Sequence, residues 1–345
     1  MNIPLKSNQL DAYLVSNDAN IRYLTGFPAG ESWLLVLPTK SFYITDFRYV
    51  EEAKKGLPKG VTVKRYEKSV FKTVFDLARD HKIKNLGFDD RHVALSFFKN
   101  LQKECPKGIK LTAKNGLVEN LRQVKTPQEI SYIRKALQIH AQAYRYLRPL
   151  IKPGVSEKEL FEKLQAFVKA KGVGFSFSPI IASGPNSALP HAKVTGRRFK
   201  RNDVVLIDMG IDYKGYKSDL TRMFFLGRIP RLVSDMNAKV KSAQLQAITK
   251  IRAGVRASDV DHEARNYLAK NHLTKYFGHS LGHGVGLEIH EDPRLSSVNT
   301  GVLQENVVVT VEPAVYIPSK FGIRIEDMVL VTRTGCEVLS GYIDQ

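Results

Sequence analysis

Two aspartates in apolar surroundings, Asp208 and Asp219, are the residues with the clearest potential for chemistry. Asp208 lies in the apolar run Val204–Met209, and Asp219 begins a second run, Asp219–Leu226, after a turn around Tyr213–Gly215. The aspartates are eleven positions apart, which predicts a β-hairpin that places them opposite each other on one face. Two carboxylates that face each other in a buried sheet cannot both stay ionised without a cation. This spacing therefore predicts a cation site.

A second pair of acids occupies two equivalent segments later in the chain. Glu312 ends the run Val307–Glu312, and Glu326 lies inside Gly322–Val331, which is the expected partner strand. Glutamates in apolar strands are rarely buried without partners. If the two hairpins pack about a pseudo-twofold axis, their four carboxylates will surround one point.

One histidine, His283, has a glycine on each side, Gly282 and Gly284. Flanking glycines let the backbone approach a neighbouring segment closely and aim the imidazole without steric cost. Four carboxylates and one imidazole suit divalent manganese, cobalt, zinc or iron. Four acids are too many for a single catalytic zinc, whereas they suit two metals that share bridging carboxylates and activate a water molecule. These residues predict a two-metal hydrolase.

The elements that must position these residues fall into two regions. Apolar runs alternate with helical patterns in the first third of the chain, which predicts an α/β domain. The expected strands are Tyr13–Ser16, Ser32–Leu37, Ser41–Thr45 and Asn85–Phe88, and the expected helix is Ser69–Asp80. Thr126 then has the character of a helix N-cap and Pro127 suits a first turn, which predicts a long helix to about Leu147. We place the domain boundary before this helix, which gives domains 1–121 and 122–345.

The second domain contains a weak internal repeat. Ile151–Val155 begins one copy, and Ile251–Val255 begins another copy one hundred residues later. A helix, a segment that contains a histidine, and a β-hairpin are expected after each start. The expected capping pairs are Ser156 with Glu159 and, in a looser form, Ser258 with Asp261. Self-similarity at a fixed offset predicts two copies of one structural unit, and hence an α+β domain with duplicated halves.

Composition excludes several classes of protein. The chain of 345 residues suits two domains, and the two cysteines, Cys105 and Cys336, provide neither a disulfide framework nor a cysteine-based metal site. The first residues lack the apolar region of a signal peptide, and no stretch of about 18 apolar residues exists, so we expect a cytoplasmic protein without a membrane span. The net charge of +19 invites a nucleic-acid partner, but the basic residues are spread along the chain without a nucleic-acid-binding motif.

Six ordered motifs resemble those of the pita-bread metallopeptidases, which include prolidases, Xaa-Pro aminopeptidases and methionine aminopeptidases. The motifs are Val204–Gly210, Lys217–Arg222, Gly282–Gly286, His290-Glu291, Val311–Pro313 and Arg324–Asp327. Two further segments, Asn20–Gly26 and Thr45–Tyr49, resemble the amino-terminal domain that prolidases share with Xaa-Pro aminopeptidases. Simple methionine aminopeptidases lack that domain. The resemblance implies an α/β amino-terminal domain followed by an α+β pita-bread catalytic domain.

The resemblance also implies a role for each matching ligand. Asp208 resembles the bidentate ligand of one metal, and Asp219 and Glu326 resemble the bridging carboxylates. His283 and Glu312 resemble the ligands of the second metal. The implied cofactor is two divalent ions per subunit, with Mn²⁺ or Co²⁺ first and Zn²⁺ or Fe²⁺ as alternatives.

Four other residues match family positions near the substrate. His191 and His290 resemble the histidines that contact the substrate near the scissile bond, and Arg324 resembles an arginine close to the site. Arg294 resembles an arginine that grips the free carboxylate of a dipeptide. The expected catalytic residues are therefore His191, His290, Arg324 and Glu312, the last of which would also move a proton from water to the leaving amine.

The implied function is binuclear-metal-dependent hydrolysis of the peptide bond before proline, in a dipeptidase of the prolidase type. The alternative is an Xaa-Pro aminopeptidase that acts on longer peptides, and Arg294 favours the dipeptidase. A non-catalytic module that binds protein or nucleic acid is disfavoured, as is a creatinase-like enzyme, because all five ligand positions are filled. The expected partners are small peptides with proline after the scissile bond and, in a homodimer, a second copy of the chain.

Overall fold

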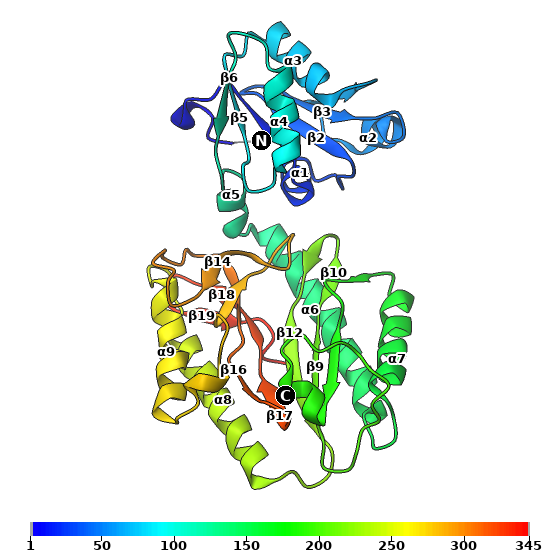
Figure 1. Ribbon diagram of the computed structural model, residues 1–345, viewed down its shortest axis with the longest axis vertical. Helices are drawn as coiled ribbons and strands as arrows, with labels where there is room; N and C mark the ends of the chain where they lie inside the picture. Colours follow the sequence, from blue (N-terminus) through cyan, green and yellow to red (C-terminus); the bar gives the residue numbers. More distant parts are fainter. Residues whose placement is uncertain (1–2, 344–345) are drawn as a thin grey trace. The chain divides into compact units, whose positions relative to one another are not determined.

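The computed structural model describes residues 3–343, and the chain divides into two compact units (Figure 1). Unit 1 is Met1–Arg122 and unit 2 is Gln123–Gln345. Each unit buries apolar cores of its own, as a chain of this length requires. Within the described range, every helix is too short or too polar to cross a bilayer.

Unit 1 is built on one mixed sheet of six strands in the order β4-β3-β2-β1-β5-β6. The strands are β1 (Ala12–Val15), β2 (Ser32–Val36), β3 (Ser41–Thr45), β4 (Val61–Arg65), β5 (Asn85–Phe88) and β6 (Lys110–Ala113). The pairs β1–β2 and β2–β3 are antiparallel, and the other three pairs are parallel. The four predicted strands are confirmed. The two strands that were not predicted, β4 and β6, lie at the edges of the sheet. Because edge strands are partly exposed to water, their sequences contain polar residues instead of an apolar run.

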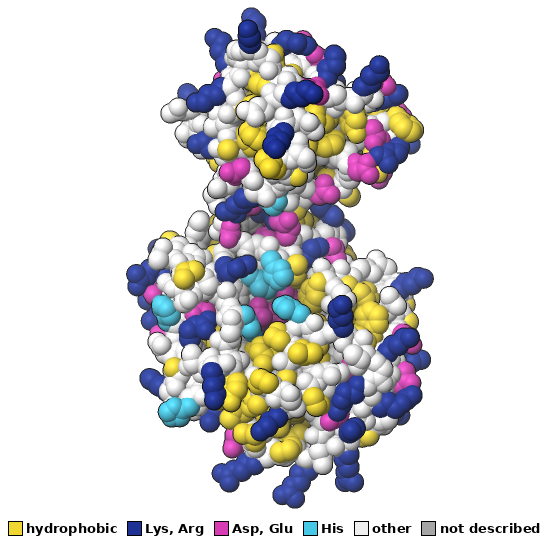
Figure 2. Space-filling view, viewed as in Figure 1, with side chains coloured by type: hydrophobic (Ala, Val, Ile, Leu, Met, Phe, Trp, Pro, Cys, Tyr) yellow, Lys and Arg dark blue, Asp and Glu magenta, His cyan; other side chains and the backbone are white. Residues whose placement is uncertain are grey.

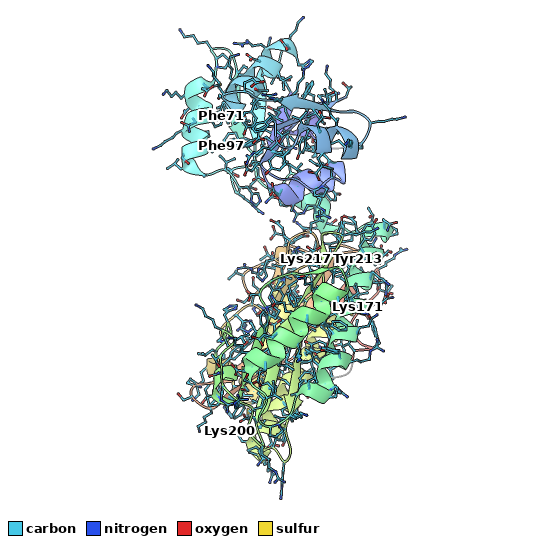
Figure 3. The ribbon with its side chains drawn as sticks, turned by 90° about the vertical axis from the view of Figure 1, so that its right-hand side faces the viewer. Phe71, Phe97, Lys171, Lys200, Tyr213 and Lys217 are labelled. Atoms are coloured by element: carbon cyan, nitrogen blue, oxygen red, sulfur yellow. The ribbon has the colours of Figure 1, made fainter. Side chains whose placement is uncertain are left out.

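Helices cover both faces of this sheet. They are α1 (Asp18–Thr25), α2 (Val50–Gly56), α3 (Val70–Asp80), α4 (Leu95–Glu104) and α5 (Glu119–Gln123), with a short 3₁₀ helix η1 (Lys6–Asn8) before them. Successive side chains of a strand point to opposite faces of the sheet and enter different apolar cores. Leu14 packs with residues of α3 and α4, and Tyr13 packs with residues of α1 and α2. Phe71 of α3 and Phe97 of α4 meet edge to face, with ring centroids 4.8 Å apart (Figure 3).

The first half of unit 2 opens with the long helix α6 (Pro127–Leu147), whose predicted N-cap is confirmed. Thr126 Oγ1 accepts from the N–H of Glu129, and the Glu129 carboxylate accepts from the N–H of Thr126. The other elements are η2 (Arg148–Leu150), α7 (Glu157–Ala170), β7 (Gly174–Phe175), β8 (Ile180–Ser183), η3 (Gly184–Ala188), β9 (Val204–Met209), β10 (Ile211–Tyr213), β11 (Tyr216–Lys217) and β12 (Leu220–Phe225). The strands form two three-stranded sheets, β12-β9-β8 and β11-β10-β7.

The second half has a corresponding order of elements. They are α8 (Arg231–Lys250), α9 (Ala257–Lys270), η4 (Thr274–Tyr276), β13 (Gly282–Gly284), β14 (Glu291–Leu295), β15 (Val308–Val311), β16 (Ala314–Ile317), β17 (Phe321–Arg324), β18 (Asp327–Val331) and β19 (Cys336–Val338). Five strands form the sheet β14-β13-β15-β18-β19, and β16 pairs separately with β17. The prediction of one strand over Gly322–Val331 is wrong. The chain leaves one sheet after Arg324 and enters the other at Asp327, and this break re-aims the residues between them.

The two halves of unit 2 repeat each other in detail. The N–H of Gly154 donates to the carbonyl of Phe199, and the N–H of Gly254 donates to that of Leu303, both at 2.9 Å. Both glycines have positive φ, 94° and 84°, which glycine adopts without strain. The helices that follow, α7 and α9, begin one hundred residues apart and have equal lengths. The predicted duplication is therefore present in the fold.

The caps of these two helices differ. The capping box of α7, with Ser156 and Glu159, is confirmed. The looser cap at Ser258 is wrong, because α9 begins at Ala257 and Ser258 lies inside its first turn. Arg256 occupies the N-cap position and makes no side-chain capping bond. The repeat thus preserves the path of the backbone and not the local capping chemistry.

Candidate metal centre

The first two predicted acids come from β9 and from the residue before β12. Asp208 pairs with Thr221 in the ladder between these strands, so the prediction that Asp208 lies opposite Asp219 is wrong by two residues. Because strand side chains alternate, Asp219 still shares the face of Thr221 and hence of Asp208. Both carboxylates are buried, with 8% and 4% of the residue exposed.

The other two acids lie where the second hairpin changes sheets. Glu312 directly follows β15, and Glu326 directly precedes β18. The last pair of that ladder is Val311 with Asp327, so Glu312 and Glu326 come next in the same register. Glu326 is buried, and Glu312 is partly exposed. The expected placement of these glutamates within regular strands is therefore wrong: both lie beyond the end of regular pairing.

His283 lies on β13, and its glycine neighbours have the predicted steric role. A Cβ at Gly282 would lie 1.9 Å from the carbonyl oxygen of Thr310, and one at Gly284 would lie 2.4 Å from that of Asp292. The imidazole Nε2 is 3.3 Å from a carboxylate oxygen of Glu312 and 3.6 Å from one of Asp219.

Three of these side chains are spaced so that they could share one cation. Asp219, His283 and Glu326 each offer one ligand atom, and these atoms lie within 4.8 Å of one another. This is a spacing at which a single cation could contact all three donors.

The electrostatics of the cluster show an excess of buried negative charge. Burial and the neighbouring carboxylates raise the pKa values of Asp219 and Glu326 well above their ordinary range. Burial also raises the pKa of Asp208, although the Arg324 guanidinium opposes the shift. Burial would raise the pKa of Glu312 as well, but hydrogen bonding to His283 and the charge of that imidazole hold it low. Only protons or cations can offset this concentration of acids.

One carboxylate oxygen of the cluster has the environment of a metal-binding atom. Oδ1 of Asp208 is buried and has no hydrogen-bond partner among the described residues, whereas Oδ2 accepts from Arg324. Orphaned buried polar atoms are rare in folded proteins. A set of four carboxylates and one imidazole is also the donor chemistry of divalent transition metals. The residues present therefore fit a metal centre.

Arg324 lies behind the acids and holds several of them in place. Its guanidinium donates to Asp208, to the hydroxyl of Thr221 at 3.0 Å and to the hydroxyl of Tyr316 at 2.6 Å. A further N–H donates to the carbonyl of Pro190 at 3.2 Å. The residue is only 3% exposed, and its donors are engaged by the chain itself. The structure thus gives Arg324 a supporting position, and direct contact with substrate stays a prediction.

Of the remaining predicted residues, His290 lies against His283. The ring of His290 meets that of His283 edge to face, with centroids 4.4 Å apart. Burial and the charge of His283 lower the pKa of His290, and the nearby Arg294 and His191 act in the same direction. Those two residues are exposed. Figure 2 shows histidine and acidic side chains together on this face of unit 2.

Comparison with known proteins places this arrangement in a family. Residues 131–333 match the model of metallopeptidase family M24, and residues 4–124 match the creatinase/prolidase N-terminal domain. The chain belongs to metallopeptidase family M24. The acids, His283 and His290 all lie inside the M24 match, so the family assignment and the geometry concern the same part of the chain.

Relatives of this M24 chain resemble it over nearly its whole length. It is 34% identical to the Xaa-Pro dipeptidase of Pyrococcus horikoshii, over 97% of this chain and 94% of that protein. It is 36% identical to a putative Xaa-Pro aminopeptidase of Mycoplasma genitalium, over 95% of this chain and 92% of that protein. The solved structure of an Xaa-Pro dipeptidase from Bacillus anthracis superimposes with a TM-score of 0.93 at 34% identity, covering 99% of this chain and 96% of that one.

Sequence reasoning missed the residues that support the M24 centre. Thr221 donates from its hydroxyl to Glu326 at 2.8 Å, and its strand position two residues after Asp219 could have revealed that it shares the face of the acids. Tyr316, which contacts Arg324 and lies 3.4 Å from His279, had no comparable signal.

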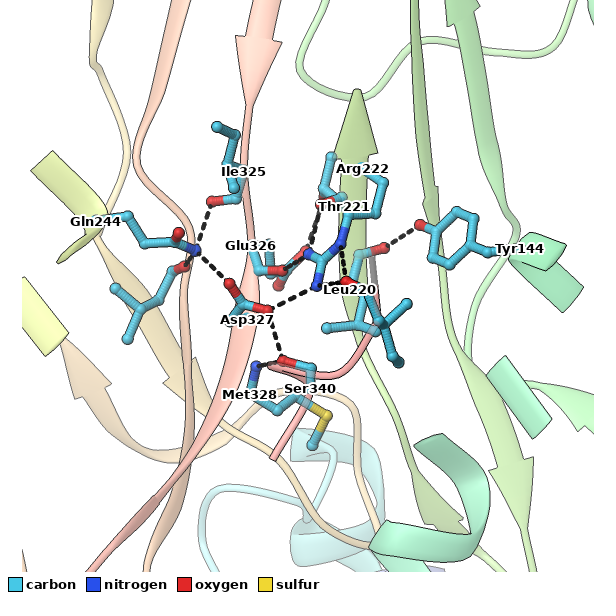
Figure 4. A network of polar contacts seen from close by, with 12 residues as sticks. Tyr144, Leu220, Thr221, Arg222, Gln244, Ile325, Glu326, Asp327, Met328 and Ser340 are labelled. Carbon is cyan, nitrogen blue, oxygen red and sulfur yellow. Dashed lines mark hydrogen bonds and ion pairs between the residues drawn. The ribbon is translucent and has the colours of Figure 1, made fainter. Parts of the chain in front are cut away.

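A second supporting group is a buried polar network beside the acids (Figure 4). Arg222 donates to the carbonyl of Glu326 and, at 2.7 Å, to the carboxylate of Asp327. Asp327 also accepts from Gln244 at 3.1 Å and from the hydroxyl of Ser340 at 2.6 Å. This network fixes the backbone on either side of Glu326.

Proposed function

We propose that this chain is a binuclear-metal-dependent Xaa-Pro dipeptidase. The observation that carries the proposal is the convergence of Asp208, Asp219, Glu312 and Glu326 on His283, with an orphaned carboxylate oxygen among them. The substrate class is supported by M24 relatives at 33% and 34% identity that are named Xaa-Pro dipeptidases and align over nearly the whole chain. Recognition would depend on the proline ring and the preceding residue, since the scissile tertiary amide offers no N–H.

Five residues would hold the metals. Asp208 would bind one ion, Asp219 and Glu326 would bind both, and His283 and Glu312 would bind the second. When bound, such ions lower the pKa of water toward neutrality and polarise the scissile carbonyl. Mn²⁺ or Co²⁺ are the proposed ions, with Zn²⁺ or Fe²⁺ as alternatives that the donor set also accepts.

The chain's own residues would orient the peptide and move its protons. His290 has a lowered pKa and is therefore a neutral donor near pH 7, able to hydrogen-bond the oxygen that gains negative charge. His191 would contact the leaving nitrogen side of the bond. Glu312 is held ionised by His283, so it can accept a proton from water and pass it to the leaving amine. Arg324 would keep Asp208 ionised and correctly aimed.

The preference for dipeptides depends on Arg294. Its exposed guanidinium, which contributes to lowering the pKa of His290, supports a role in pairing with a free carboxylate one residue beyond the scissile bond. Replacing Arg294 with Ala should raise KM for Ala-Pro at least tenfold and leave Ala-Pro-Ala little changed. The exposed Arg333→Ala serves as the matched control. Equal effects on both peptides would instead favour the Xaa-Pro aminopeptidase named among the relatives.

A decisive test of the function uses the whole chain with defined metals. Hydrolysis of Ala-Pro should depend on added Mn²⁺, Co²⁺ or Zn²⁺, and Asp219→Ala should abolish both turnover and tight metal binding. Turnover that persists in Asp219→Ala would refute the ligand assignment. Tight metal binding without hydrolysis of any Xaa-Pro peptide would refute the dipeptidase and leave a non-catalytic module.

A nucleic-acid partner is disfavoured by the surface. Lysine and arginine side chains are spread over the visible face instead of forming one stripe (Figure 2). In the densest basic segment, Arg197 pairs with Asp203 and Arg198 pairs with Glu159. We further propose a cytoplasmic homodimer, the state that the family resemblance implies.

A further inference from the structure

His191 is a predicted active-site residue whose side chain the fold does not hold directly. Among the described residues, its exposed imidazole makes no hydrogen bond, in contrast to His279 and His283, which each contact a backbone carbonyl. The position of His191 must therefore be set by the backbone of its segment. That segment, residues 184–195, contains only the short 3₁₀ helix η3 and turns.

A single buried carboxylate, that of Glu157 on α7, ties both ends of this segment together. At the beginning, the N–H and the hydroxyl of Ser183 each donate to Oε1 at 2.8 Å, and the amide of Asn186 donates at 3.0 Å. At the end, Thr195 donates to Oε2 from its N–H at 3.0 Å and from its hydroxyl at 2.6 Å. Glu157 is fully buried, so these charge-assisted bonds form away from water.

The other side of the segment is attached to β17, beside the metal centre. The N–H of Gly322 donates to the Ser187 hydroxyl at 2.8 Å, and Arg324 donates to the carbonyl of Pro190, the residue before His191. Arg324 also holds Asp208. The segment is therefore fastened to the centre on one side and to Glu157 on the other, with His191 between the two sets of bonds.

The second half contains a comparable device at a different position. Asp261 of α9 is fully buried; it accepts from the N–H of Leu281 at 3.1 Å and pairs with Arg265. Arg265 in turn donates to the carbonyl of His279 at 3.0 Å. Asp261 thus holds the segment before His283. It lies one helical turn further along α9 than Glu157 lies along α7. Both halves therefore use a buried acid to fix the segment that carries a predicted active-site histidine, although the two acids occupy different positions on their helices. This recurrence indicates that the conformation of these segments matters.

We propose that Glu157 is a positioning residue for the reaction, which fixes the segment carrying His191 so that this imidazole faces the substrate. The proposal rests on the proposed function. Glu157 contacts none of the five predicted metal ligands, so its loss should impair turnover without releasing metal. Misplacing a reacting group by about 1 Å costs on the order of 100-fold in rate, which sets the scale of the expected effect.

The test compares Glu157→Gln with Glu162→Gln, an exposed glutamate on the same helix. Gln has nearly the same shape but presents an N–H₂ group to donors of Ser183 or Thr195. Glu157→Gln should lose about 10-fold to 100-fold in kcat for Ala-Pro with unchanged metal stoichiometry, whereas Glu162→Gln should stay within about twofold of the unaltered chain. In the metal-free protein, hydrogen exchange over residues 184–195 should accelerate in Glu157→Gln alone.

A double-mutant cycle with His191→Ala separates positioning from general support. If Glu157 acts through His191, Glu157→Gln should cost less than about threefold in kcat once His191 is absent. An equal loss in both backgrounds, a loss of metal, or full activity of Glu157→Gln overturns the proposal. If Glu157→Gln does not fold, Thr195→Val removes one donor and the same cycle applies. Absence of Xaa-Pro hydrolysis in the unaltered chain would refute the proposed function instead.

Discussion

Gln244 of α8 offers the sharpest test of how the proposed metal ligands are held. Its amide nitrogen lies 3.0 Å from the carbonyl of Val311, 3.2 Å from that of Ile325 and 3.1 Å from the carboxylate of Asp327 (Figure 4). Val311 and Ile325 directly precede the proposed ligands Glu312 and Glu326. The β15–β18 ladder ends at Val311, so these carbonyls lie where strand pairing stops, and a side chain from a helix provides their donor.

Replacing Gln244 with Leu keeps the volume and removes that donor. Leaving a buried acceptor unsatisfied costs about 1–3 kcal/mol, and two carbonyls lose the same donor, so unit 2 should be destabilised by about 2–6 kcal/mol. Groups that support metal ligands from behind typically change affinity by about 10-fold to 100-fold. We therefore expect metal affinity to fall by about that factor at 25 °C, where the variant remains folded.

Urea unfolding followed by far-ultraviolet circular dichroism and a metal titration measure the two effects. Trp33, the only tryptophan of the chain, lies in unit 1, and its fluorescence transition should not move. Gln246→Leu, at an exposed position on the same helix, is the matched control. Unchanged metal affinity in a destabilised Gln244→Leu would show that the ligands do not depend on this backbone support. That result would refute the reasoning.

Two further changes test separate parts of the structure. Arg324→Lys replaces a fork that reaches Asp208, Thr221 and Tyr316 with a single ammonium, so kcat/KM should fall at least 10-fold, by about 1.4 kcal/mol or more, in a steady-state assay of Ala-Pro hydrolysis. Wild-type kinetics in that variant would show the fork to be dispensable. Asp89→Asn tests unit 1, where burial and the charge of Glu119 raise the pKa of Asp89 to about 6 from an ordinary 3.8. Because the folded pKa is the higher one, the stability that Asp89 provides is complete below pH 4 and is lost as the pH rises through 6. Asp89→Asn should therefore stabilise unit 1 by about 1–3 kcal/mol at pH 7.5 and by almost nothing near pH 4, read from Trp33 fluorescence in urea; a gain that is the same at both pH values would contradict this.

Periodicity and capping residues revealed the buried strands β1, β2, β3 and β5 of unit 1 and the helices α3, α6 and α7, whose N-caps have side-chain hydrogen bonds. They did not reveal β4 and β6, because an edge strand is partly exposed to water and therefore needs no apolar run. They also placed Asp219 opposite Asp208, because the prediction assumed that a single turn joins the two strands. The chain instead inserts β10 and β11 between the two strands and shifts the register by two residues.

The cluster of four acids around His283 could be predicted because buried acids and a glycine-flanked histidine are conspicuous against apolar neighbours. Gln244 could not, because a glutamine on an amphipathic helix has the same sequence signature whether it faces water or a strand end. The role of Glu157 could not be predicted either, because its five donors come from a segment about thirty residues away. Local pattern locates chemical groups, whereas the partners of buried polar groups are set by tertiary structure.

Several contacts that hold the proposed ligands cross from one half of unit 2 to the other. Thr221, in the first half, donates to Glu326 in the second, and Arg324, in the second half, donates to Asp208 in the first. Arg222 and Asp327 form a buried ion pair across the same division. Each half therefore contributes two acids and the donors that aim the other half's acids. Neither half can form the centre alone, so any change that lets the halves separate must loosen the acids on both sides at once.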